Sequence, residues 1–225
     1  MILWCGGEDI DFLSAPAVSV SLTAAAFRAA YARCGVYQNG MNTIGASNPF
    51  PAGPVTSAWL SARVYGANNF GSASYPTQRA IGFGLSGTSK GLFVGSASGS
   101  NNGNKLALCK YDGTNTTQLA AEGGASLAPT TQYCLNVQVV NFGVAATVNV
   151  YLNGALLIAY TGDVTVSGMT SFDSVFLARI TDGYLITSEI IVADEDTRGM
   201  SGLAIGSCKL PDAMWANSWR SVSRR

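Results

Sequence analysis

The sequence predicts an all-β protein, an antiparallel sandwich of two sheets, and three observations support this prediction. About ten short apolar or alternating runs follow one another between Val55 and Asp194, at spacings near ten residues. Hairpin-type turn residues separate them, and the amphipathic helices that a parallel α/β sheet requires are missing. No repeat of fixed period is visible, which argues against a propeller or a solenoid. We therefore expect two packed sheets around one apolar interior.

Residues 1 to about 55 differ in character from the rest. The alanine-rich stretch from Leu22 to Arg33 has small residues and weak periodicity, so a short helix and an irregular segment both remain open. Three prolines between Asn48 and Pro54 forbid a continuous strand or helix, and they predict a turn-rich connector.

The strand-like runs then follow in order. They cover residues 57–66, 80–86, 91–97, 105–113, 116–122, 132–142, 145–154, 155–162, 171–180 and 184–194. The dipeptides Asp112-Gly113 and Asn153-Gly154 are suited to tight hairpins, and Thr181-Asp182-Gly183 is expected to join the last two runs.

The run 145–154 shows the clearest alternation. Apolar residues at 146, 148, 150 and 152 form one face, and polar residues or Tyr151 form the other. This pattern indicates one face packed on a core and one facing solvent or a neighbour.

The charge content of the chain excludes several classes of partner. Charged residues make up 12% of the 225 residues, against an ordinary share of about 25%, and the net charge is zero. Without basic blocks we expect no nucleic acid partner, and we read the arginine-rich end, Arg220 to Arg225, as a solvated tail. The uncharged stretch from Gly123 to Gly162 is interrupted by amide side chains, among them Asn136, Gln138 and Asn149, so no membrane partner is expected either.

The five cysteines are expected to be buried, reduced thiols. They lie far apart, their number is odd, and none has metal-ligand spacing; they are Cys5, Cys34, Cys109, Cys134 and Cys208. This pattern is typical of a protein made in a reducing cytoplasm. The start of the chain has no basic region followed by a long apolar run, so we expect no signal peptide.

The chain contains no histidine, which removes His-based triads and the commonest general base near neutral pH. Carboxylate chemistry of the glycosidase type remains. Glu8, Asp9 and Asp11 are the only group near such a motif, and Leu13 stands where a second glutamate is needed. We therefore expect solvated acids in a loop, no catalytic residues, and no enzyme.

The acids Asp194, Glu195 and Asp196 follow the last strand-like run directly. A calcium loop would need a carboxylate or amide at position 198, and Arg198 stands there instead. The alternative of a looser calcium site on Asp194 and Asp196 stays open. The favoured interpretation is that the acids end the strand and block edge pairing, while Asp196 or Thr197 caps a turn. No cofactor is expected.

Aromatic side chains could mark a sugar site, because a ring can stack on a pyranose. The candidates on the predicted strands and loops are Trp59, Tyr65, Tyr75, Tyr111 and Tyr151. Most strand aromatics of a sandwich belong to its core, so the sequence selects none of them. The glycine-rich runs at 86–91 and 98–104 are not followed by helices and predict loop tips rather than a phosphate cradle.

Two stretches carry a family resemblance. The hairpin "VNVYLNGALLIAYTGD", residues 148–163, resembles that of concanavalin A-like (laminin-G-like) sandwiches. The stretch from "SFDSVFLARI" to "SEIIVADEDTRGM" is similar to the final strands of tailed-bacteriophage virion proteins of this fold, and "ILWCGGEDIDF" fits their short first strand. The resemblance covers residues 1 to 200, and its specific part is 148–200.

The resemblance implies a jelly-roll sandwich that serves, without catalysis, in a phage particle made in the bacterial host cytoplasm. A tail fibre or tail-associated protein that acts in assembly and host adhesion is the leading expectation. Its partners would be other virion proteins, further copies of the chain as a homo-oligomer, and a host surface glycan. The alternatives are a carbohydrate-binding module for bacterial surface polysaccharide, and a head decoration or head-fibre protein.

The segment 201–225 lies outside the sandwich domain, which is predicted to span 1–200. Trp215 and Trp219 are four residues apart and would share one face of a helix. They could dock this segment onto its own sandwich or onto a neighbouring subunit, and both options are open.

Overall fold

The structure, a computed structural model, describes residues 2–6, 37–38, 44–46, 50–66, 79–88, 90–96, 105–120, 132–179 and 185–198. All regular elements in these ranges are strands. They are β1 (Ile2–Gly6), β2 (Tyr37–Gln38), β3 (Ile44–Ala46), β4 (Ala58–Gly66), β5 (Arg79–Gly84), β6 (Gly91–Ser96), β7 (Leu106–Tyr111), β8 (Thr116–Gln118), β9 (Gln132–Val140), β10 (Ala146–Leu152), β11 (Ala155–Gly162), β12 (Ser174–Arg179) and β13 (Leu185–Ala193).

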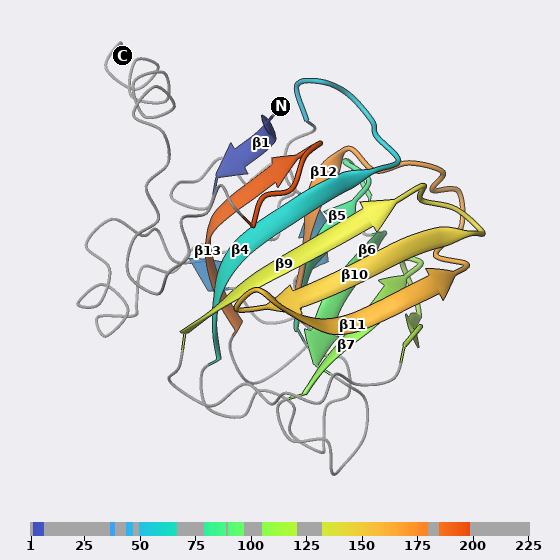
Figure 1. Ribbon diagram of the computed structural model, residues 1–225. Coiled ribbons are helices and arrows are strands. Elements are labelled where there is room, and N and C mark those ends of the chain that lie inside the picture. The colour runs from blue at the N-terminus through green and yellow to red at the C-terminus, as the bar shows by residue number, and fades with distance from the viewer. Residues whose placement is uncertain are drawn as a thin grey trace.

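The strands form two antiparallel sheets that pack face to face (Figure 1). The seven-stranded sheet has the order β1-β13-β4-β9-β10-β11, and β2 also pairs with β13. The six-stranded sheet has the order β3-β12-β5-β6-β7-β8. The predicted all-β antiparallel sandwich is confirmed. The first strand expected at the start of the chain is also present as β1, whereas the sequence did not indicate β2 or β3.

Two predicted hairpins form at the turn residues that the sequence indicated. Asn153 and Gly154 have φ values of 50° and 82°, and they connect β10 to β11. Both residues of such a tight turn need positive φ, which Asn and Gly tolerate best. The turn from Asp112 to Asn115 connects β7 to β8, and Asp112 Oδ1 accepts hydrogen bonds from the backbone N–H groups of Thr114 and Asn115.

The last two strands do not form the pair that their sequence neighbourhood suggested. β12 belongs to the six-stranded sheet, where it lies between β3 and β5, whereas β13 belongs to the seven-stranded sheet between β1 and β4. The chain therefore crosses from one sheet to the other between them. The expectation that the acids after β13 protect a sheet edge is also wrong, because β13 has a partner strand on both sides.

The core lies between the inner faces of the two sheets. The burial of β10 alternates along its whole length, with residues 146, 148, 150 and 152 buried as predicted. Phe83 and Phe172 contact each other in the middle of the core, with ring centroids 4.4 Å apart, and Phe142 meets Phe172 edge-on at 5.8 Å. Aromatic pairs of this kind add to the stabilisation that burial itself provides.

A buried acid holds the turn between β5 and β6. Asp173 is 8% exposed, and its carboxylate accepts hydrogen bonds from the backbone N–H and the hydroxyl of Ser86, both at 2.7 Å. These two bonds compensate the burial of the carboxylate, so we assign Asp173 a structural role.

The structure tests the prediction for two of the cysteines, whereas three other predictions concern residues that it does not describe. Cys109 and Cys134 are buried, reduced thiols, as expected. The possible helix at 22–33, the acids Glu8, Asp9 and Asp11, and the segment 201–225 with Trp215 and Trp219 lie outside the described residues. Among the residues that the structure describes, no helix is long and apolar enough to cross a membrane.

Candidate functional site

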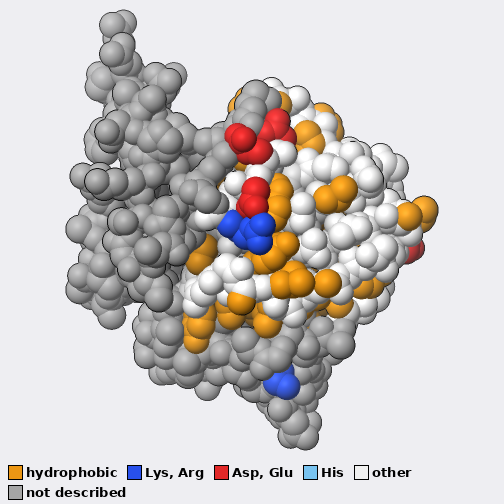
Figure 2. Space-filling view, viewed as in Figure 1, with side chains coloured by type: hydrophobic (Ala, Val, Ile, Leu, Met, Phe, Trp, Pro, Cys, Tyr) orange, Lys and Arg blue, Asp and Glu red, His pale blue; other side chains and the backbone are white. Residues whose placement is uncertain are grey.

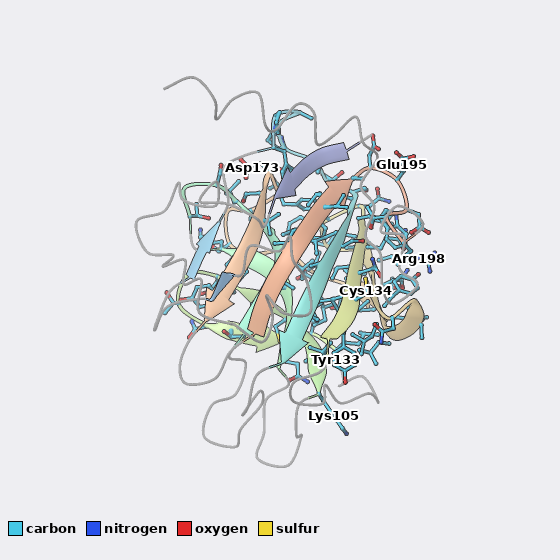
Figure 3. All side chains as sticks on the ribbon, turned by 90° about the vertical axis from the view of Figure 1, so that its left-hand side faces the viewer. Lys105, Tyr133, Cys134, Asp173, Glu195 and Arg198 are labelled. Atoms are coloured by element: carbon cyan, nitrogen blue, oxygen red, sulfur yellow. The ribbon has the colours of Figure 1, made fainter. Side chains whose placement is uncertain are left out.

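The outer face of the seven-stranded sheet carries the cluster of side chains with the most distinctive chemistry. Figure 2 shows basic and acidic side chains next to each other over the middle of this face, with hydrophobic side chains around them. Figure 3 shows Arg198 and Glu195 on this side of the molecule, whereas Asp173 lies at a distance from them.

Trp59 and Tyr151 form an aromatic pair across this face. Trp59 is on β4 and Tyr151 is on β10, so that β9 runs between them. Their ring centroids are 5.7 Å apart and the rings are inclined by only 23°. Neighbouring strands lie about 4.8 Å apart, so two strands would separate the side chains by about twice that distance if they stood upright. The two rings therefore lean toward each other above β9.

Arg198 covers this aromatic pair. Its guanidinium carbon lies 4.2 Å from the ring centroid of Tyr151 and 5.0 Å from that of Trp59. A cation above an aromatic face is attracted by the negative potential of the ring. The side chain of Arg198 is 36% exposed, while Trp59 is buried and Tyr151 half-buried. Tyr151 and Arg198 thus form the accessible surface of this cluster.

Asp196 holds the guanidinium in place. Nη2 of Arg198 donates to Oδ2 of Asp196 at 2.6 Å, and Nε lies 3.0 and 3.1 Å from the two carboxylate oxygens. The backbone N–H of Arg198 also donates to Oδ1 at 2.9 Å, which closes the turn after β13. The hydrogen bond from the Arg198 side chain is the main reason why the pKa of Asp196 is lowered, and the same bond raises the pKa of Arg198.

A buried network of hydrogen-bonded polar side chains anchors this turn to the sheet. Thr197 is fully buried, and its hydroxyl accepts a 2.5 Å hydrogen bond from the hydroxyl of Ser61 on β4. The side-chain amide of Asn136 on β9 in turn donates to the Ser61 hydroxyl. Ser61 and Asn136 are each 1% exposed. Because buried polar groups require partners, this polar network fixes Thr197, and with it the position of the neighbouring Arg198.

An amide pair lies next to the aromatic pair. Gln138 on β9 stands between Trp59 on β4 and Asn149 on β10 in the strand register. The Asn149 amide donates to the Gln138 side-chain oxygen at 3.0 Å, and both side chains are partly exposed. Together with Tyr151 and Arg198, these residues present a ring, two amides and a guanidinium on one surface, which we call the aromatic–amide face.

The structure places only some of the aromatic residues that the sequence suggested for a sugar site. Of the five aromatic candidates, the structure brings Trp59 and Tyr151 together. Tyr111 lies in the six-stranded sheet, 6.5 Å from Phe176 between ring centroids. Tyr75 and the side chain of Tyr65 lie outside the described residues.

The strand-ending interpretation of the acids is confirmed, because β13 ends at Ala193 and Asp196 caps the next turn. Asp196, one of the two calcium candidates, is engaged with Arg198 instead. Within the described ranges, no group of three or more His, Cys, Asp or Glu residues is arranged to hold a metal ion.

Sequence reasoning missed Arg198, Gln138, Asn149 and the Ser61–Asn136–Thr197 network as parts of a site. A signal existed for the amides, since the alternation in 132–142 and 145–154 places them on the polar faces of neighbouring strands. The register between the strands, which aligns Gln138 with both Trp59 and Asn149, is a tertiary property. Arg198 was noticed only as a residue that does not fit a calcium loop.

Comparison with known proteins supports the fold. No family model matches the sequence, and no similar sequence is found among curated proteins. The alginate lyase Aly36B has a similar structure, with a TM-score of 0.51, 12% identity, and coverage of 70% of this chain and 80% of the lyase chain.

The binding domain of Paraclostridial Mosquitocidal Protein 1 is also similar, with a TM-score of 0.50 and 7% identity. The match covers 86% of this chain and 49% of the other chain, so this chain spans about half of that protein's length. A double mutant of congerin II has a TM-score of 0.42 and 13% identity, with coverage of 68% of this chain and 99% of congerin II.

At these identities the likeness to the alginate lyase and to the binding domain shows the fold alone, a two-sheet antiparallel sandwich of the concanavalin A-like jelly-roll type. The names of these three proteins do not identify a phage component, and the virion role stays a prediction.

Proposed function

We propose that this protein is a non-catalytic carbohydrate-binding module, and that the aromatic–amide face contacts the glycan. The observation that carries the proposal is the position of Tyr151 and Arg198 beside the paired amides of Gln138 and Asn149. The part of the Tyr151 ring that Arg198 leaves accessible can contact the apolar face of a sugar, and fixed amides and a guanidinium can hydrogen-bond to its hydroxyl groups. Proteins named as a lyase of the polysaccharide alginate and as a binding domain share the fold, which makes the proposal compatible with the comparisons.

The charges near the face favour a neutral glycan over a polyanionic one. Asp196 neutralises Arg198, and the exposed acids Asp194 and Glu195 precede this pair in the chain. The segment therefore has three acids and one arginine. Because Asp196 already neutralises Arg198, this guanidinium offers a carboxylated or sulfated polymer no net charge to bind, and a neutral surface polysaccharide needs none.

A non-catalytic role is supported by three carboxylates among the described residues. The pKa values of Asp112, Asp163 and Asp196 are all lowered, in each case mainly by hydrogen bonds to the ionised form. A general acid for glycoside hydrolysis requires the opposite, a pKa raised toward neutrality. Incubation with neutral polysaccharides should leave their solution viscosity unchanged, and a progressive loss of viscosity would contradict this part of the proposal.

Calorimetric titration with neutral polysaccharides from bacterial surfaces tests the binding. Tyr151→Ala should weaken binding by about tenfold or more, since loss of a central aromatic contact typically costs over 1 kcal/mol. Tyr111→Ala, on the other sheet, is the matched control and should bind like the wild type. Failure of the wild type to bind any glycan, or undiminished binding by Tyr151→Ala, would overturn the assignment of this face.

The more specific hypothesis is that the module acts in host adhesion as a tail-associated component of a phage particle. It is supported by the resemblance of residues 148–200 and by the low charge content. Immunogold labelling of phage particles with an antibody against this chain tests it. Label on tails is expected, label on heads would favour a head-fibre or decoration role, and unlabelled particles would contradict a virion role.

A further inference from the structure

The edge strand β11 is exposed and carries neither the charged side chains nor the proline by which sheets commonly avoid pairing with other chains. It ends the seven-stranded sheet beside β10, and Figure 1 shows it as the last arrow on that side of the sheet. Its sequence, ALLIAYTG, has no charged residue and no proline. Exposed edges are commonly protected by charged side chains, by proline or by short length, because their unpaired backbone groups attract further strands.

The other terminal strands in the described part of the chain are shorter. β11 has eight residues, whereas β1 has five and β3 and β8 have three each. Leu156 on β11 is 57% exposed, and Ala159 and Thr161 are exposed as well. Among these terminal strands, β11 is therefore the longest.

The regular part of β11 defines where a second strand could pair. An irregularity between Val150 and Tyr151 of β10 displaces the pairing near Leu157, while the register from Ile158 to Gly162 is unbroken. Bulges twist an edge strand and oppose pairing there. The regular segment 158–162, with Tyr160 at its midpoint, remains available.

We propose that β11 pairs antiparallel with β11 of a second copy of this chain, about a two-fold axis at Tyr160. Such a contact is isologous, so one strand that is complementary to itself is sufficient. In this register Ala159 of each copy lies opposite Thr161 of the other.

The charge next to the strand favours this orientation. Asp163, whose side chain is 53% exposed, follows the strand directly. Antiparallel pairing about Tyr160 places the two Asp163 carboxylates at opposite ends of the ladder, where each lies across from Leu157. Parallel pairing in register would place them next to each other, and like charges directly opposite are destabilising.

This pairing would join two seven-stranded sheets into one continuous sheet. The aromatic–amide faces of both copies would then lie on connected surfaces. The pairing itself depends only on β11 and is independent of whether the face binds a glycan.

Sedimentation velocity of the wild type and of two double variants tests the proposal. The wild type should be a dimer at micromolar concentration. Ala159→Lys with Thr161→Lys places lysines opposite each other in the proposed register and should raise the dimer dissociation constant by about tenfold or more. Ala159→Lys with Thr161→Glu places opposite charges there and should retain the dimer.

The two variants differ only in the sign of one introduced charge, and both positions are exposed, so folding should be equally preserved in both. A monomeric wild type would overturn the proposal. A dimer that the two-lysine variant leaves intact would exclude β11 as the contact, and equal loss of the dimer in both variants would exclude the register about Tyr160.

Discussion

The guanidinium carbon of Arg198 lies 4.2 Å from the ring centroid of Tyr151, although the two residues are 47 positions apart in the chain. Arg198 belongs to the turn after β13, and Tyr151 belongs to β10, which is separated from β13 by β4 and β9. The turn thus extends across two strands to reach Tyr151, and this contact joins opposite halves of the seven-stranded sheet.

Replacement of Arg198 should lower the stability of the fold measurably. Arg198→Ala removes the contacts with Trp59 and Tyr151 and the ion pair with Asp196, and we expect a loss of about 0.5–1.5 kcal/mol in the free energy of unfolding. Arg198→Lys should lose less, because the charge is kept while the planar, bidentate geometry is not. Urea unfolding gives the free energy of unfolding of both variants. Equal values for Arg198→Ala and the wild type would show that the contacts of Arg198 contribute nothing to the stability of the fold.

The hydrogen bond between Ser61 on β4 and Thr197 in the turn after β13 should couple the energetic effects of replacing these two residues. Thr197→Val keeps the side-chain shape but removes the acceptor for the Ser61 hydroxyl, and we expect a cost of about 1–3 kcal/mol. Ser61→Ala should have a similar cost, since it also leaves the Asn136 amide without this acceptor. In a double-mutant cycle measured by urea unfolding, the double variant should cost less than the sum, and strict additivity would contradict direct coupling.

Gly91 should tolerate no side chain, because Phe176 fills the space beside it. A Cβ atom at Gly91 would lie 2.5 Å from two ring carbons of Phe176 and 2.9 Å from the backbone oxygen of Phe83. We expect Gly91→Ala to destabilise the fold by about 1–3 kcal/mol through overpacking. Gly143→Ala is the matched control, since its nearest atom would be 3.7 Å away. Thermal unfolding should separate the two variants, and equal midpoints would contradict this packing.

The Cys109 thiol should resist alkylation in the native protein. Burial raises its pKa from 9.0 to about 12, so the reactive thiolate is scarce at pH 8. Folding favours the neutral thiol. Its contribution to stability is therefore present below the starting pKa of 9.0 and is lost as the pH rises through the folded value of about 12. Iodoacetamide labelling mapped by mass spectrometry should find Cys109 unmodified in buffer and modified in urea. Rapid native labelling of this residue would contradict its burial.

Much of the strand content could be predicted, because alternation and turn chemistry are local properties. The run 145–154 indicated its buried face correctly, and Asn153-Gly154 marked a real hairpin because few other residues accept positive φ at both turn positions. The same local reasoning failed for residues 171–194. A turn-like tripeptide between two strands does not reveal whether the chain stays in one sheet or crosses to the other.

The sequence by itself determined that the chain is a β-sandwich, where most of its strands lie, and that histidine-based catalysis is absent, since these follow from composition and short-range pattern. Only the tertiary structure decided which side chains gather on the face that we propose as the site. The register of β4, β9 and β10 brings Trp59 and Tyr151 within 5.7 Å, and the buried anchor of Thr197 places Arg198 above them. These contacts join residues 47 to 139 positions apart, and no local pattern encodes which of many exposed side chains will meet.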